Sequence, residues 1–178
     1  LIMKLKYIIP LFLLFALGTI SSCDLLGNAD DVSFEAELPL AFTVDEQADN
    51  PSGKSYTDSQ LLNASSDPDV AKYASKIKEF KVNRITYRIS GATDPLVSFT
   101  NGTLKLASGK TIATVSSVSL SNTAELELNA DTAGFNELAS ALLSDKQEMV
   151  QLQGTLSKTP IKFYVDFTFY TTITANAL

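Results

Sequence analysis

The chain has 178 residues and a net charge of −6, with 14 basic residues set against 20 acidic ones. Nucleic-acid binding needs a concentrated basic surface, so this balance argues against nucleic acid as a partner. The sequence contains no histidine, the commonest general base and transition-metal ligand, and we expect neither a metal nor another cofactor.

The first 22 residues have the pattern of a secretory signal peptide. Lys4 and Lys6 form a short basic start, and an apolar run extends from Tyr7 to Ile20. That run is shorter than the ~20 residues that a membrane-spanning helix needs. A basic start, a short apolar run and small residues at the cut are typical of a cleaved leader. Without residues 1–22, twelve basic residues face twenty acidic ones, and the net charge becomes −8.

The only cysteine follows this leader directly, in the order Ile20, Ser21, Ser22 and Cys23. An aliphatic residue, two small residues and a cysteine resemble the lipobox of bacterial lipoproteins. The resemblance implies that Cys23 carries diacylglycerol and that the new amino terminus is acylated, with palmitate as a typical chain. Two or more acyl chains anchor a protein stably. The resemblance thus implies a lipid-anchored protein of the bacterial cell envelope, periplasmic or surface-exposed. An ordinary cleaved leader with a chance cysteine stays open.

Residues 23–31 form a short acidic tether, and we expect a single β-rich domain over 32–178. Its first strand covers 32–44, where apolar side chains recur at every second position from Val32 to Val44. Pro39 falls in the opposite phase and cannot donate to a sheet ladder, which favours an edge strand or a bulge. The polar, turn-rich segment 45–67 is interpreted as a mobile surface excursion.

A helix is predicted over 68–80, because Asp67-Pro68 suits a helix start and Val70, Tyr73, Ile77 and Phe80 recur at near-helical spacing. Alternation then predicts a strand over 84–90. Residues 96–110 are interpreted as two short strands or one strand bulged at Asn101-Gly102, and 111–120 and 124–128 as weaker strands.

A second helix is predicted over 131–144, capped by Asn129 or Asp131. Two further strands follow, and the last alternates for about fifteen residues from Ile161. Strands with one apolar face, separated by turns, indicate a mainly β fold. We expect an antiparallel β-sandwich or curved sheet with two short helices.

Two groups of side chains are candidates for binding a partner. Six of the basic residues lie between 72 and 88, and of these we single out Lys72, Lys76, Arg84 and Arg88. They could contact an anionic glycolipid or another envelope protein, although a solvated face with acids nearby is the favoured interpretation. Tyr164 and Tyr170 fall in the polar phase of the last strand. Either they are exposed contact residues or a second layer covers them, and covering is the favoured interpretation.

No motif identifies a reaction. Ser75 and Lys78 match the S-x-x-K pattern of penicillin-recognising enzymes, but the companion elements are missing. Asp131-Thr132-Ala133 resembles a bacterial O-glycosylation acceptor and is equally ordinary helix capping. We therefore expect no catalytic residues and no enzyme, but a membrane-anchored, non-catalytic binding or structural module. The alternative is a carrier or sensor of an apolar ligand such as a lipid, with Phe34, Phe42, Phe163, Phe167 and Phe169 lining its cavity.

Overall fold

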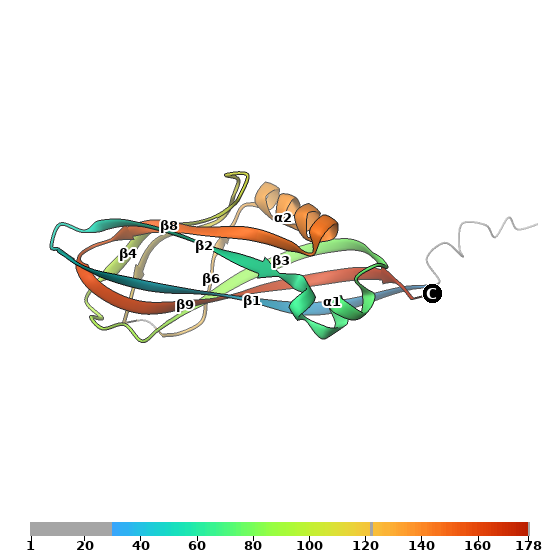
Figure 1. Cartoon of the computed structure of the whole chain (residues 1–178), viewed down its shortest axis with the longest axis horizontal. Coiled ribbons are helices and arrows are strands. Elements are labelled where there is room, and N and C mark those ends of the chain that lie inside the picture. The colour runs from blue at the N-terminus through green and yellow to red at the C-terminus, as the bar shows by residue number, and fades with distance from the viewer. Residues whose placement is uncertain (1–29, 122, 178) are drawn as a thin grey trace, which may run out of the picture.

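The computed structural model describes residues 30–121 and 123–177. The predicted signal peptide 1–22, Cys23 and the tether up to residue 29 lie outside the described residues. The described part is mainly β, and its two sheets pack as a sandwich with two α-helices (Figure 1). The predicted fold class is therefore confirmed, and the sandwich is the correct one of the two alternatives.

Nine strands form the two sheets, and every paired strand is antiparallel in the described part of the chain. Sheet A has the order β1-β9-β3-β6, and sheet B has the order β2-β8-β4-β5-β7. The elements are β1 (Asp31–Asn50), β2 (Lys54–Asn63), the 3-10 helix η1 (Ala64–Ser66), α1 (Pro68–Tyr73), β3 (Ile77–Ser90), β4 (Ser98–Leu106), β5 (Thr111–Ser119), β6 (Leu126–Glu127), β7 (Asn129–Ala130), α2 (Thr132–Asp145), β8 (Gln147–Leu156) and β9 (Thr159–Asn176).

The sandwich is elongated, and its two ends differ (Figure 1). At one end the β1–β2 and β8–β9 turns each carry the chain from one sheet to the other. At the opposite end β1 begins beside the end of β9, and α1 lies close by (Figure 1). Asp67 caps α1 by accepting hydrogen bonds from the amides of Asp69 and Val70. Any anchor that precedes β1 in the chain would therefore join the domain at the α1 end.

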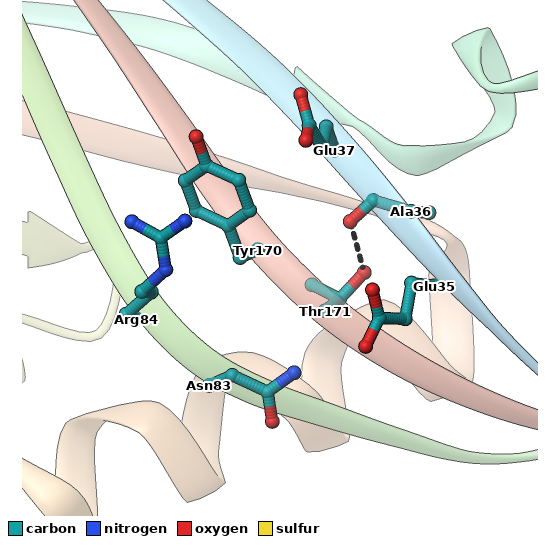
Figure 2. A pocket seen from close by; sticks show the side chains of 7 residues that line it. All are labelled: Glu35, Ala36, Glu37, Asn83, Arg84, Tyr170 and Thr171. Carbon is teal, nitrogen blue, oxygen red and sulfur yellow. Dashed lines mark hydrogen bonds between the residues drawn. The ribbon is translucent and has the colours of Figure 1, made fainter.

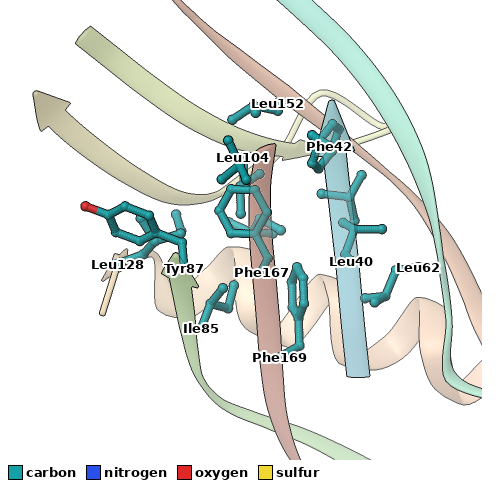
Figure 3. Packing of buried hydrophobic residues seen from close by; sticks show 14 of the residues in the cluster. Leu40, Phe42, Leu62, Ile85, Tyr87, Leu104, Leu128, Leu152, Phe167 and Phe169 are labelled. Carbon is teal, nitrogen blue, oxygen red and sulfur yellow. The ribbon is translucent and has the colours of Figure 1, made fainter. Parts of the chain in front are cut away.

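The core forms because the long strands bury every second side chain. Along β1 the buried residues run from Ala36 to Val44, and along β9 they run from Thr159 to Ala175. The interior is tightly packed (Figure 3). Phe42 and Phe167 meet edge to face with ring centroids 5.8 Å apart. The first and last strands, whose alternation is longest, are therefore major contributors to the core, and such burial supplies much of a protein's stability.

On the side where β6 ends sheet A and β7 ends sheet B, the sandwich is closed by α2 and by the segment that precedes this helix. We call residues 126–130 the strap: β6 pairs with β3 in sheet A, and β7 pairs with β5 in sheet B. Leu128, between them, is buried. The helix α2 is capped by Asp131, whose carboxylate accepts a hydrogen bond of 2.7 Å from the Gly134 amide. Of the two residues considered as its cap, Asp131 is the correct one.

The interpretation of 45–67 as a mobile surface excursion is wrong. β1 continues to Asn50, a short turn follows, and β2 pairs with β8 along its whole length. Few apolar residues mark this region because β2 is an edge strand with only Tyr56 and Leu62 buried. Its inward positions Asp58 and Gln60 are half-buried polar residues, so the apolar alternation that would reveal a strand is interrupted.

The helix predicted over 68–80 is too long. α1 ends at Tyr73, and Ile77 and Phe80 belong to β3. Val70 is the buried residue of the short helix, while Phe80 and Val82 start the period-two burial of the strand. A helical stripe and the start of a strand overlap here, because residues 77 and 80 suit either period. Pro39 is confirmed on an edge strand, since β1 ends sheet A.

The interior holds little empty space in the described part of the chain. Two small cavities lie near Leu128, each of about 20 Å³, and they share four lining residues: Val115, Leu128, Leu152 and Phe167. Figure 3 shows three of these side chains within the packed cluster. A space of this size is about that of one water molecule. The aromatic residues expected to line a ligand cavity therefore fill the core, except for Phe34, which is half-buried against Tyr73 at 5.5 Å.

Candidate functional site

The outer face of sheet A carries a groove of about 370 Å³. Figure 2 shows its lining, which comes from three adjacent strands. The lining residues are Glu35, Ala36 and Glu37 of β1, Asn83 and Arg84 of β3, and Tyr170 and Thr171 of β9. Because β9 lies between β1 and β3, its side chains form the middle of the groove and the other two strands form its sides.

Strand register places these side chains. Glu37 pairs with Tyr170, and Tyr170 pairs with Arg84, so the three form one row across the sheet. The β3–β9 register shifts between Val82 and Arg84, which makes Asn83 the extra residue of a β-bulge. A bulge re-aims the neighbouring side chains, and Asn83 and Arg84 are consecutive exposed residues. This is why one strand contributes two adjacent side chains to the groove.

Arg84 lies over the ring of Tyr170, with its guanidinium carbon 3.5 Å from the ring centroid. This is a cation–π contact, and it holds the arginine beside the middle strand. The Tyr170 hydroxyl donates a 3.2 Å hydrogen bond to Glu125 Oε1. Hydrogen bonding from Thr86 and then from Tyr170 lowers the pKa of Glu125 below its usual value. The Thr86 hydroxyl is buried without a partner of ordinary hydrogen-bond geometry, so Tyr170 is the better-defined donor.

The groove contains charges of both signs, and its arginine interacts electrostatically with the nearby Glu125 carboxylate. Arg84, Glu35 and Glu37 form no ion pair in this part of the chain. Elsewhere in the described residues, five lysines each form an ion pair with a carboxylate: Lys54, Lys78, Lys110, Lys158 and Lys162. The three charged groups of the groove are therefore not held in ion pairs and can contact a ligand.

Polar contacts hold the rest of the groove in place. The Asn83 amide donates a 2.8 Å hydrogen bond to the Thr172 hydroxyl of β9. The buried Thr171 hydroxyl donates a 3.0 Å hydrogen bond to the Ala36 carbonyl of β1. These two bonds tie β9 to both neighbouring strands at the base of the groove, so its sides are fixed relative to each other.

Charge is distributed unevenly across this face. The β1 side carries Glu35 and Glu37, and the β3 side carries Lys81, Arg84 and Arg88. Between them, β9 presents uncharged side chains at Thr168, Tyr170, Thr172 and Thr174, and Asp166 follows opposite Arg88. At the groove the face thus has carboxylates on its β1 side and a guanidinium on its β3 side, separated by uncharged side chains of β9, while Glu79 and Asp166 lie farther along the strands.

The structure brings together two of the six residues singled out as binding candidates, because Arg84 and Tyr170 are in contact in the groove. Arg88 and Tyr164 lie on the same outer face of sheet A, farther along β3 and β9. Lys72 lies in α1, 4.7 Å from the Tyr73 ring, and Lys76 precedes β3. Lys76 is eight residues from Arg84, or roughly 26 Å along an extended chain. The basic residues between 72 and 88 are therefore spread along the molecule.

The two candidate tyrosines also lie apart. Tyr164 is 41% exposed and six residues from Tyr170, about 20 Å along β9. Tyr170 is half-buried, and the side chain over its ring belongs to Arg84 of the neighbouring strand. The favoured interpretation, that a second layer covers both tyrosines, is wrong.

Sequence reasoning missed Glu35, Glu37, Asn83 and Glu125. The two glutamates gave a usable signal, because both occupy outward positions of a strand whose other face is apolar. Asn83 gave none, since a bulge depends on the partner strand. Glu125 lies in a loop and acts on the groove through its hydrogen bond with Tyr170 and its proximity to Arg84.

The weaker motifs resolve into structural roles. Ser75 follows α1 in a turn, and Lys78 pairs with Asp31 from within β3, so the two are not one helical turn apart. Asp131 caps α2. Within residues 30–121 and 123–177 no three His, Cys, Asp or Glu side chains are grouped so as to hold a metal ion. No helix described there is long and apolar enough to cross a bilayer.

No family model matches the chain, and no curated protein matches it. Seven chains of solved structures are similar, among them the following two. The decameric BFDV capsid protein has a TM-score of 0.48 and 9% identity, covering 80% of this chain and 99% of that chain. A chain of Desmodium yellow mottle tymovirus has a TM-score of 0.43 and 9% identity, covering 83% of this chain and 82% of its own. Both TM-scores are below 0.5, so neither carries an argument about this protein.

Proposed function

We propose that this protein is a lipid-anchored component of the bacterial cell envelope, periplasmic or surface-exposed, that acts as a non-catalytic binding or structural module. The lipobox resemblance at Cys23 supports the anchor. The observation that carries the binding role is the groove of sheet A, with charges of both signs that no described side chain pairs. Its partners are the bilayer, through acylated Cys23, and another envelope protein or an anionic glycolipid.

The place of the groove in the domain agrees with an anchored binding module. Seven residues separate Cys23 from Asp31, and an extended chain spans at most about 3.5 Å per residue, or about 25 Å in all. Glu35 and Glu37 lie within the first seven residues of β1, so the groove is in the half of the sandwich nearer the anchor. A ligand at the membrane surface or just above it is within reach.

Replacing Cys23 with alanine tests the anchor. We expect the variant to leave the detergent phase and to appear as soluble protein or unprocessed precursor, because the acyl chains have no attachment site. A Ser22→Ala variant keeps a small residue and the cysteine and serves as the matched control. Unchanged partitioning of Cys23→Ala into the detergent phase would contradict the proposed anchor.

A carrier or sensor of an apolar ligand is the second candidate, and the apolar lining around Leu128 favours it. Cavities of about 20 Å³ do not hold an acyl chain, so this function requires the strap to move away from the sheets. Native mass spectrometry of the purified protein discriminates between the two. A co-purifying lipid beyond the anchor supports the carrier, and a mass explained by the acylated chain alone supports the binding module.

A further inference from the structure

We propose that the groove of sheet A binds a small zwitterion, with its ammonium group at Glu35 and Glu37 and its oxyanion at Arg84 and Asn83. This inference deepens the binding function proposed above and rests on it. The ligand chemistry is an ammonium and an oxyanion in one molecule, as in phosphoethanolamine. Either a free metabolite or the headgroup of a lipid supplies this chemistry.

The first argument is the balance of charge. Two carboxylates on β1 and one guanidinium on β3 face the same space without ion-pair partners in the described part of the chain. A ligand with a single charge would satisfy one side and partly desolvate the other without compensation, which is costly. A zwitterion satisfies both sides with charge-assisted hydrogen bonds.

The second argument is that the two sides do not neutralise each other. Strands β1 and β3 are separated by β9, and two inter-strand spacings amount to roughly 9.6 Å. Tyr170 stands between Glu37 and Arg84 in the same row and stacks with the arginine at 3.5 Å. Figure 2 shows the ring between the two charged groups. The separation is therefore built into the sheet, and a ligand that carries both charges can bridge it.

The third argument is the way in which the donors are presented. A guanidinium that stacks on a ring keeps its N–H groups in its own plane, where they can meet an oxyanion. The Asn83 amide nitrogen has two hydrogens, and its 2.8 Å bond to Thr172 uses one of them. Arg84 and Asn83 are adjacent because of the bulge, so both donors lie on the β3 side of the groove, where an oxyanion can reach them.

The size of the groove limits the ligand to a small molecule. Ligand pockets occupy about 300–1,000 Å³, and this groove, at about 370 Å³, is near the lower limit. It has room for one headgroup-sized molecule. A bulky glycan would have to extend onto the flanking threonines of β9.

Binding is measured with the full chain in an uncharged detergent, by titrating ligands and following amide chemical shifts. The probes are phosphoethanolamine, ethanolamine and inorganic phosphate. We expect phosphoethanolamine to bind at least about tenfold more tightly than either of the others, which is the effect of one additional charge-assisted hydrogen bond. Glycerophosphoethanolamine distinguishes the sources, since equal or tighter binding indicates a lipid headgroup and loss of binding indicates a free metabolite.

Variants locate the site. Glu35→Gln combined with Glu37→Gln, and separately Arg84→Gln, should each weaken phosphoethanolamine binding by about tenfold or more. Asp49→Asn combined with Asp69→Asn, and separately Lys105→Gln, make the same charge changes outside the groove and should leave affinity within about twofold of wild type. All of these positions are at least partly exposed, and an unchanged circular dichroism spectrum will verify folding.

Three results would overturn the proposal. The first is binding of ethanolamine or phosphate as tight as that of phosphoethanolamine, and the second is groove variants that behave like the controls. The third is the absence of saturable binding for every probe. None of these results bears on the Cys23 anchor, whose own test is detergent partitioning, so the two proposals can fail separately.

Discussion

Replacing Gly134 with alanine tests how α2 is joined to the sandwich. Gly134 is buried in the first turn of the helix, and an added Cβ would lie 2.1 Å from the Thr111 carbonyl oxygen and 2.7 Å from the Ile112 Cα. Both atoms belong to the backbone of β5, which pairs with β4 and β7 and cannot yield as a side chain would. The helix itself must therefore move, and it carries the buried Phe135 and Leu138.

The sign of the effect is the informative quantity. In an exposed helix, glycine to alanine stabilises by about 1 kcal/mol. Overpacking a core costs about 1–3 kcal/mol and often more when the clash is with backbone. We expect the second effect to win, so Gly134→Ala should lower the free energy of unfolding by about 1–3 kcal/mol.

Urea unfolding followed by circular dichroism measures this change, with the slope of the transition checked for constancy. Asn136→Ala is the matched control, because residue 136 is exposed on the same helix, and it should leave stability unchanged or slightly higher. A Gly134→Ala variant as stable as wild type would refute the close approach of α2 to β5.

Two further predictions concern the core and the surface carboxylates. Phe169 is fully buried, so Phe169→Ala should lower the free energy of unfolding in urea by about 3–5 kcal/mol. Tyr164, on the outward phase of the same strand, is 41% exposed. A smaller loss of free energy for Phe169→Ala than for Tyr164→Ala would contradict the strand phase. Side-chain hydrogen bonds lower the pKa values of Asp45, Asp94 and Glu125 in the folded state. Their stabilisation is therefore present above the unfolded pKa values near 4 and is lost as the pH falls through the lower folded values. The urea concentration at the unfolding midpoint should decrease as the pH is lowered from about 5 to about 3. A midpoint that increases as the pH is lowered would show the sign to be wrong.

The elements that sequence predicted best are those whose pattern is local and long. The first and last strands alternate for more than ten residues, and one buried face follows directly from that period. α2 was predicted almost to its ends, because Asp131 is a strong N-cap and the apolar stripe that follows is helical. Even the bulge in β4 was predicted as an alternative, since Asn101-Gly102 suits a break, and Asn101 has a positive φ of 52°.

The errors arose where the deciding contacts are distant in sequence. β2 is held by its ladder with β8, nearly a hundred residues later, and its own side chains are mostly polar. The groove depends on the same kind of information. Arg84 and Tyr170 were found as candidates from their residue types, but their contact follows from the β3–β9 register and the Asn83 bulge. Register between distant strands cannot be read from either strand alone.

The edge of sheet A gives a last prediction, about solubility. β1 is twenty residues long and pairs only with β9 in the described part of the chain, so one of its edges lacks a strand partner. Such an edge invites pairing with a second copy. The Thr43 carbonyl faces away from β9, since it accepts the Tyr56 hydroxyl of β2. Pro39 is four residues before Thr43, and backbone groups an even number of residues apart in a strand point to the same side. The backbone N–H that proline lacks would therefore face this open edge.

Replacing Pro39 with valine restores that N–H and a strand-forming side chain. We expect concentration-dependent self-association above that of wild type, measured by sedimentation velocity, because the row of edge donors becomes continuous. Ala41→Val is the matched control: residue 41 is exposed on the same face, so it adds apolar surface while Pro39 remains. Association of both variants to the same extent would assign the effect to hydrophobic surface. Sedimentation of Pro39→Val identical to wild type would show that the missing donor does not protect this edge.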